Sequence, residues 1–97
     1  MLVALERFDL RIPGCGSLKE KRHVVKTLTA GLRSKFNVSV AEVDHHDLWQ
    51  RTTIAVGAAA GEAFHAKKVM HEVEKFVERW GEVEVIEAEL TLHYPDD

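Results

Sequence analysis

The chain has 97 residues, of which 45% are hydrophobic and 30% charged, and its formal net charge is −3. This composition is typical of a soluble globular protein and excludes a disordered tail, and the length predicts one domain spanning residues 1–97. The small negative charge excludes a protein that binds nucleic acid through its overall charge, so any such binding requires a local basic patch.

No part of the sequence predicts export or membrane insertion. The N-terminus reads MLVALER, with no basic leader, and no apolar stretch is long enough to span a bilayer. Cys15 is the single cysteine, which excludes an internal disulfide framework and a structural zinc site built on several thiolates. We therefore expect a cytoplasmic protein.

The first expected strand covers residues 2–12, where apolar residues alternate with Arg7, Asp9 and Arg11. Glu6 interrupts this alternation, which suggests a bulge or a twist at that point.

A turn with the sequence PGCG, residues 13–16, separates this strand from the first expected helix. Ser17 and Glu20 have the spacing of a capping box, so we expect the helix to begin at Ser17 and to run to about Lys35. Four residues at helical spacing form its apolar stripe: Leu18, Val25, Leu28 and Leu32.

Two strands and a second helix follow. Residues 36–44 and 51–59 are expected strands, and the short polar turn between them predicts a hairpin. Residues 66–80 show helical spacing, with Gly81 as the expected C-terminal cap. We expect the last strand at residues 83–92, followed by a tail. Its apolar side is expected to consist of Ile86, Ala88, Leu90 and Leu92.

This order of elements favours an α+β, ferredoxin-like βαββαβ sandwich, with two helices on one face of a four-stranded antiparallel sheet. The first and third strands are then central. Arg7 and Arg11 are expected to face acidic residues of the last strand, Glu87 and Glu89, across the open face of the sheet. The small residues Ala55, Gly57 and Ala59 are expected to make that face smooth, so it either binds something flat or packs against a second copy. The face lacks the aromatic residues on which RNA bases stack, which excludes that mode of RNA recognition.

Three segments resemble the YlxP-like family of small bacterial proteins: SLKEKR at residues 17–22, FNVSVAEV at 36–43 and DLWQR at 47–51. The resemblance covers essentially the whole chain. It implies a ferredoxin-like fold, no established activity and no catalytic residues. Genes of this family commonly lie beside those for a translation initiation factor and ribosome-binding factor A, so the resemblance also implies a role near translation or ribosome maturation.

The strongest physical signal is the first helix, which carries a net charge of +5 over residues 19–35 and leaves −8 for the rest of the chain. Four of its basic side chains fall within about 60° on a helical wheel, along about 21 Å of helix. This stripe consists of Lys19, Arg22, Lys26 and Arg33. It is long enough to contact several phosphates along one nucleic-acid strand. The alternative interpretation is an ordinary solvated helix face.

Two further residues are candidate contacts. Lys21 lies on the apolar side of the wheel, and its long side chain is expected to extend toward the preceding turn. Trp49 either folds over the edge of the core or offers a stacking surface to a base or a protein partner.

The turn before the first helix is a candidate anion site, because Gly14, Gly16 and Ser17 precede free N–H groups at a helix N-terminus. The alternative is that Ser17 and Glu20 already satisfy these groups. The turn lacks the arginine that an acylphosphatase on this fold would need. Cys15 has no catalytic partner tied to it by spacing.

A polar hairpin turn, or less simply a metal site, is expected at residues 44–47, which read DHHD. Neither a resident metal nor a cofactor is expected.

Taken with the basic stripe of the first helix, the sequence predicts a non-enzymatic domain that binds RNA or a ribosomal surface through that helix. The alternatives are a homo-oligomeric interaction module and a domain that binds a small phosphate ligand.

Overall fold

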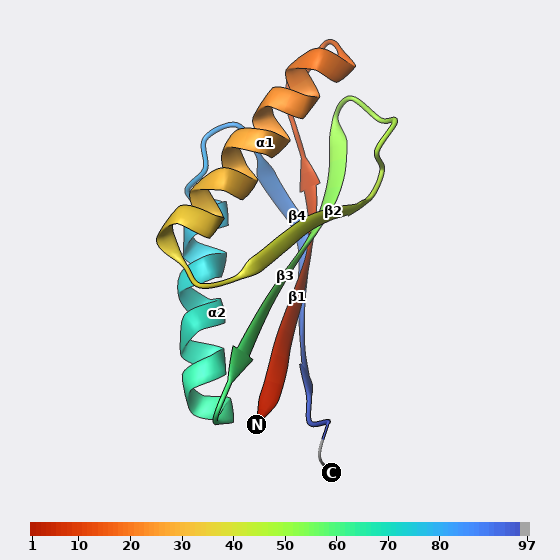
Figure 1. The fold of residues 1–97 in the computed structure, drawn as a ribbon. Coiled ribbons are helices and arrows are strands. Elements are labelled where there is room, and N and C mark those ends of the chain that lie inside the picture. The colour runs from red at the N-terminus through yellow and green to blue at the C-terminus, as the bar shows by residue number, and fades with distance from the viewer. Residues whose placement is uncertain (96–97) are drawn as a thin grey trace.

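Four antiparallel strands form one open sheet, and both helices cover the same face of it (Figure 1). The computed structural model describes residues 1–95. Its elements are β1 (Leu2–Arg11), α1 (Leu18–Lys35), β2 (Ser39–Asp44), β3 (Arg51–Ala60), α2 (Ala63–Glu78) and β4 (Glu84–His93). The strand order β2-β3-β1-β4 confirms the predicted ferredoxin-like fold. Of the expected tail, residues 96 and 97 lie outside the described part.

Alternation along β1 directs its side chains to two different environments. Leu2, Ala4, Phe8 and Leu10 are buried beneath the helices, together with residues of β3 such as Ile54. The opposite side of β1 is open to solvent over most of its length. The core therefore lies between the sheet and the helices, and the other face of the sheet stays uncovered.

Glu6 does not produce a bulge, contrary to the sequence-based expectation. It stays in regular register, opposite Val56 of β3 and Leu90 of β4, and is buried in the core. The register between β1 and β4 shifts instead between Asp9 and Leu10, where Ile86 is the extra residue of β4. A shift in the partner strand could not be seen in the local pattern of β1.

The predicted capping box at the start of α1 is present. The Ser17 hydroxyl accepts a hydrogen bond from the Glu20 N–H at 3.1 Å, and the Glu20 carboxylate accepts one from the Gly16 N–H at 2.8 Å. The helix ends as predicted at Lys35. Together these bonds fix where the helix begins and how the preceding turn enters it.

Two predicted boundaries are wrong. Strand β2 begins at Ser39, because the Phe36 N–H still bonds to the Leu32 carbonyl at 2.9 Å and caps α1. Helix α2 ends at Glu78, with Arg79 rather than Gly81 at the C-cap position.

The two helices approach each other closely at Gly31 of α1. A Cβ atom at this position would lie 3.0 Å from the Phe76 ring of α2 and 3.3 Å from the ring of Trp80, just after that helix. The rings of Phe36 and Phe76 meet edge to face, with centroids 5.8 Å apart. A side chain at position 31 would therefore require the two rings to shift, so the close approach of α1 and α2 favours glycine here. No helix among residues 1–95 is long and apolar enough to cross a membrane.

Candidate nucleic-acid interface

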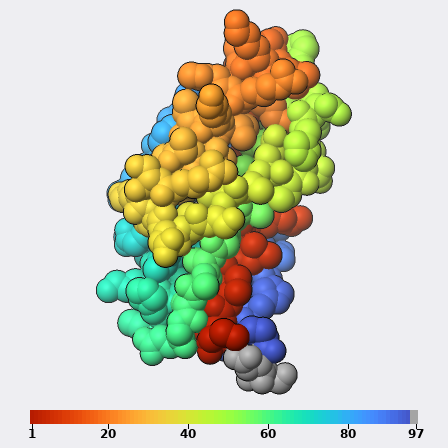
Figure 2. All heavy atoms as spheres, viewed as in Figure 1, coloured from red at the N-terminus to blue at the C-terminus, as the bar shows by residue number. Residues whose placement is uncertain are grey.

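The outward side of α1 carries the predicted basic stripe. Val24, Leu28 and Leu32 are buried against the sheet, which turns the opposite side of the helix to solvent. Figure 2 shows α1, in orange to yellow, crossing the front of the molecule beside β2. All four residues of the stripe are exposed: Lys19, Arg22, Lys26 and Arg33.

The positive charges of this stripe are not neutralised within the described structure. Among residues 1–95, no carboxylate lies within 4.0 Å of the side-chain nitrogens of Lys19, Arg22 or Lys26. Arg33 also lacks an ion pair there, but it donates a hydrogen bond to the Val40 carbonyl at 2.7 Å. Within residues 1–95, three cations without an ion pair and one that also anchors β2 therefore face solvent together.

Lys21 does not belong to this exposed set. Its side chain is only 2% exposed, its Nζ lies 3.1 Å from a Glu42 carboxylate oxygen, and it donates to the His45 carbonyl. The Thr52 hydroxyl donates to the same Glu42 oxygen at 2.5 Å. The side chain thus extends toward the β2–β3 loop and not toward the turn at residues 14–17. Because its ammonium is enclosed and paired, Lys21 is not available to contact a phosphate.

The β2–β3 loop presents an exposed apolar pair next to α1. Trp49 is 51% exposed and Leu48 is 49% exposed, so the interpretation of Trp49 as a core residue is wrong. The Gln50 side chain donates to the Cys15 carbonyl at 3.2 Å, and the Ile12 N–H donates to the Gln50 carbonyl at 2.9 Å. These bonds hold the loop against the turn that precedes α1. A shallow hollow of about 370 Å³ is lined by residues 47–51.

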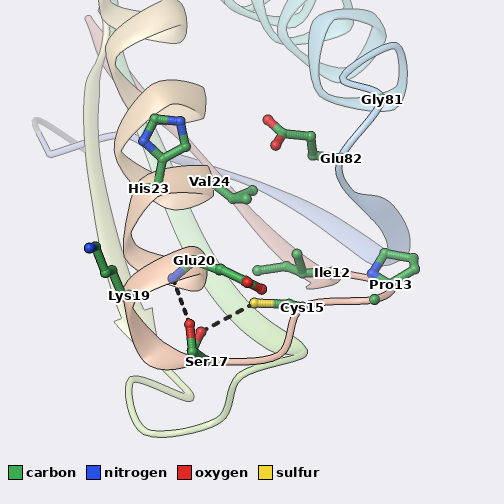
Figure 3. Close-up of a pocket in the computed structure, with 11 residues that line it drawn as sticks. Ile12, Pro13, Cys15, Ser17, Lys19, Glu20, His23, Val24, Gly81 and Glu82 are labelled. Atoms are coloured by element: carbon green, nitrogen blue, oxygen red, sulfur yellow. Dashed lines mark hydrogen bonds between the residues drawn. The ribbon is translucent and has the colours of Figure 1, made fainter.

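The turn at residues 14–17 lines a larger open pocket of about 780 Å³ (Figure 3). Glu20 and Glu82 are both among its lining residues, and Glu20 already accepts the Gly16 N–H. Lys19 points to the other side of the helix in this view. Ser17 and Glu20 thus cap the turn, and the pocket is lined by Lys19 and His23 as well as by the two glutamates, so its charge shows no preference for an anion. An anion site at Gly14, Gly16 and Ser17 stays a prediction.

Cys15 is 5% exposed, and its thiol donates to the Ser17 carbonyl at 3.4 Å. This placement makes it a packed core residue rather than a nucleophile presented to substrate.

The turn at residues 44–47 is organised by local hydrogen bonds. His45 adopts a left-handed conformation with φ 61°, and its N–H donates to the Asp44 carboxylate at 2.7 Å. Its Nδ1 lies 2.9 Å from the Thr53 hydroxyl, which donates to Asp9 at 2.6 Å. Residues 1–95 contain no group of three or more ligand-type side chains placed to hold a metal ion. The arrangement supports a polar turn whose first residue acts as a cap.

Glu6 is the chemically unusual residue that the sequence pattern showed but did not explain. Its side chain is buried on the core side of β1, and Oε1 has no hydrogen-bond partner among residues 1–95. Burial raises the pKa of Glu6 to about 8, helped by a hydrogen bond to Glu74 and by the negative charges of Glu74 and Glu78. Glu6 is therefore largely protonated at neutral pH. The sequence could not show this, because Glu74 and Glu78 lie on α2, far along the chain from Glu6.

Comparison with known proteins assigns the chain to a family. The family model described as "Protein of unknown function (DUF503)" matches residues 3–90. The chain belongs to the DUF503 family. One DUF503 relative, the "Uncharacterized protein YlxP" of Bacillus subtilis (strain 168), is 38% identical over 83 residues, which cover 86% of this chain and 90% of the relative. The resemblance seen in the sequence is thus confirmed, and membership of DUF503 carries no activity with it.

Proposed function

We propose that this protein is a non-enzymatic binding domain whose α1 face contacts the phosphate backbone of RNA, such as that exposed on a ribosomal surface. The observation that carries the proposal is the set of exposed, unneutralised cations at Lys19, Arg22 and Lys26. Arg33 extends the same stripe. Such a row attracts phosphates without reading base sequence.

Charge segregation within the molecule supports this assignment. Helix α1 has a net charge of +5, whereas α2 carries equal numbers of basic and acidic residues. With a net charge of −3 for the whole chain, non-specific attraction elsewhere on the surface is weak. RNA is therefore expected to bind in one orientation, along α1.

Trp49 supplies a second type of contact at one end of the stripe. The loop that carries it is held against the turn before α1, and the hollow at residues 47–51 lies beside its exposed ring. A base that stacks on Trp49 would leave the following phosphates near Lys19 and Arg22. The arrangement suits a short unpaired RNA segment.

The test is an RNA-binding titration over a range of salt concentrations. Three or four phosphate contacts to a single strand predict a slope of log affinity against log salt of about −2 to −3. The triple variant Lys19→Ala, Arg22→Ala, Lys26→Ala is expected to lose most of this slope.

A matched control, the α2 triple variant, removes two lysines of α2 and the arginine at its C-cap: Lys67, Lys68 and Arg79, all exposed and outside the ion pairs of the described residues. It is expected to bind as the wild type does. Equal losses in the two triple variants would show that total charge, and not the α1 face, determines binding.

The second candidate is a homo-oligomer formed through the open sheet face. Val3 and Leu5 are 40% and 39% exposed there, opposite the small residues Ala59 and Gly57 of β3. A second copy would cover these apolar side chains. A sedimentation mass equal to one chain at micromolar concentration would exclude this candidate.

A further inference from the structure

Strand β4 leaves one long edge of the sheet open. It spans ten residues, Glu84–His93, and it is the last strand in the order β2-β3-β1-β4 (Figure 1). Within residues 1–95 it pairs with β1 alone, so its outer backbone groups face no other strand. Such an edge is a template for an added strand unless its side chains prevent pairing.

One face of this edge is acidic. Glu84, Glu87 and Glu89 lie on the open side of the sheet, opposite Arg11, Asp9 and Arg7, and the strand contains no lysine or arginine. Arg11 bonds to Glu84 at 2.9 Å. Glu87 and Glu89 make no ion pair with any residue in the described part of the chain. In the part of the chain that the structure describes, two carboxylates near the middle of the edge are therefore without an ion-pair partner.

The other face of the edge is apolar and only partly covered. Ala88 is exposed and Leu90 and Leu92 are half-buried, although all three lie in register with core residues of β1. Ile86, the extra residue at the register shift, interrupts the alternation and is 51% exposed, so the prediction that it shares the apolar side of the strand is not met. Helix α2 covers the centre of the sheet more completely than this margin. The hydrophobic core therefore ends in an apolar strip beside an acidic one.

We propose that the outer edge of β4 binds an extended segment of another protein in which lysine or arginine alternates with apolar residues. In an added strand, successive side chains point to opposite faces of the sheet. The basic residues would lie beside Glu87 and Glu89, and the apolar ones would cover Ala88 and Leu90. This charge and polarity complementarity defines the partner, and the proposal is independent of RNA binding by α1.

A second copy of this chain does not fit the edge. Antiparallel pairing of two β4 strands would place Glu87 and Glu89 of one copy near those of the other, and like charges on adjacent strands are destabilising. The other edge strand, β2, contains no basic residue. The strand that does alternate arginine with apolar residues, β1, is at the centre of the sheet and is not free to pair.

The test uses three eight-residue peptides and the intact protein. In the first peptide lysine alternates with valine, in the second the same residues are arranged in two blocks, and in the third glutamate replaces lysine. Only the first is expected to bind, with NMR amide shifts confined to β4 and the adjoining surface of α2. Equal binding of the block peptide, shifts outside β4, or no binding at millimolar peptide would overturn the proposal.

Two charge-neutralising variants complete the experiment. Glu87→Gln with Glu89→Gln is expected to weaken binding of the alternating peptide by about fivefold or more, since two cross-strand charge pairs are lost. The control, Glu62→Gln with Glu72→Gln on exposed positions at α2, has the same change in charge and is expected to have no effect. Equal weakening by both variants would show non-specific attraction and would contradict the edge site.

Discussion

Replacing the buried Glu6 by glutamine is expected to make the protein more stable at neutral and alkaline pH. The wild-type carboxyl lies in the core beside Glu74 and Glu78, with one oxygen unpartnered among residues 1–95. Folding at neutral pH therefore requires that Glu6 takes up a proton. Glutamine has nearly the same shape and never has to be neutralised.

The size of the effect follows from the two pKa values of this group. The pKa of Glu6 is about 8 in the folded protein, against an ordinary value of 4.5. Because the raised value belongs to the folded state, the free energy of unfolding is unaffected below pH 4.5 and falls as the pH rises toward 8. The loss amounts to about 3 kcal/mol at pH 7 and about 5 kcal/mol above pH 8.

The assay is denaturant unfolding, followed by circular dichroism, at several pH values from 4.5 to 9. The difference in unfolding free energy between Glu6→Gln and the wild type is expected to grow from pH 4.5 to about pH 8 and then to level off. Glu62→Gln, at an exposed position, is the control and should follow the wild type. Parallel curves for Glu6→Gln and the wild type would refute the reasoning, because they would mean that Glu6 has the same pKa in both states.

Three further substitutions test the packing around α1. Lys21→Met should lower the free energy of unfolding by about 2–4 kcal/mol, because it leaves the Glu42 carboxylate without its ion-pair partner. Adding Glu42→Leu should restore about half of this loss. Denaturant titration of both variants checks the two expectations. Ser17→Ala should cost about 1 kcal/mol through loss of the cap to the Glu20 N–H, measured as a lower thermal midpoint. Gly31→Ala should also destabilise, by about 1 kcal/mol, although alanine favours helix, and a more stable variant in thermal melts would contradict the close packing of α1 on α2.

Local patterns were sufficient to predict the fold. The order of elements followed from period-2 and helical spacing, and the start of α1 followed from Ser17 and Glu20, since these signals lie within a few residues of one another. Boundaries failed where the deciding contact was distant. Strand β2 begins late because Phe36 caps α1 and packs on Phe76, which lies 40 residues further along the chain.

The candidate site was predictable in part for the same reason. The helical wheel placed the basic stripe correctly on the outer side of α1, because that is a property of one helix. It also placed Lys21 on the apolar side, but the partner Glu42 comes from β2 and could not be identified from spacing. The exposure of Trp49 and the neighbours of Glu6 on α2 likewise depend on tertiary contacts.

The most direct test of the central claim is co-sedimentation with ribosomal subunits at low and at physiological salt. We expect the wild type and the α2 triple variant (Lys67, Lys68 and Arg79 to alanine) to sediment with a subunit and to be released as salt rises. The α1 triple variant (Lys19, Arg22 and Lys26 to alanine) should stay in the supernatant at both concentrations. Binding that is insensitive to salt, or equal binding by the two variants, would contradict the assignment of function to the α1 face.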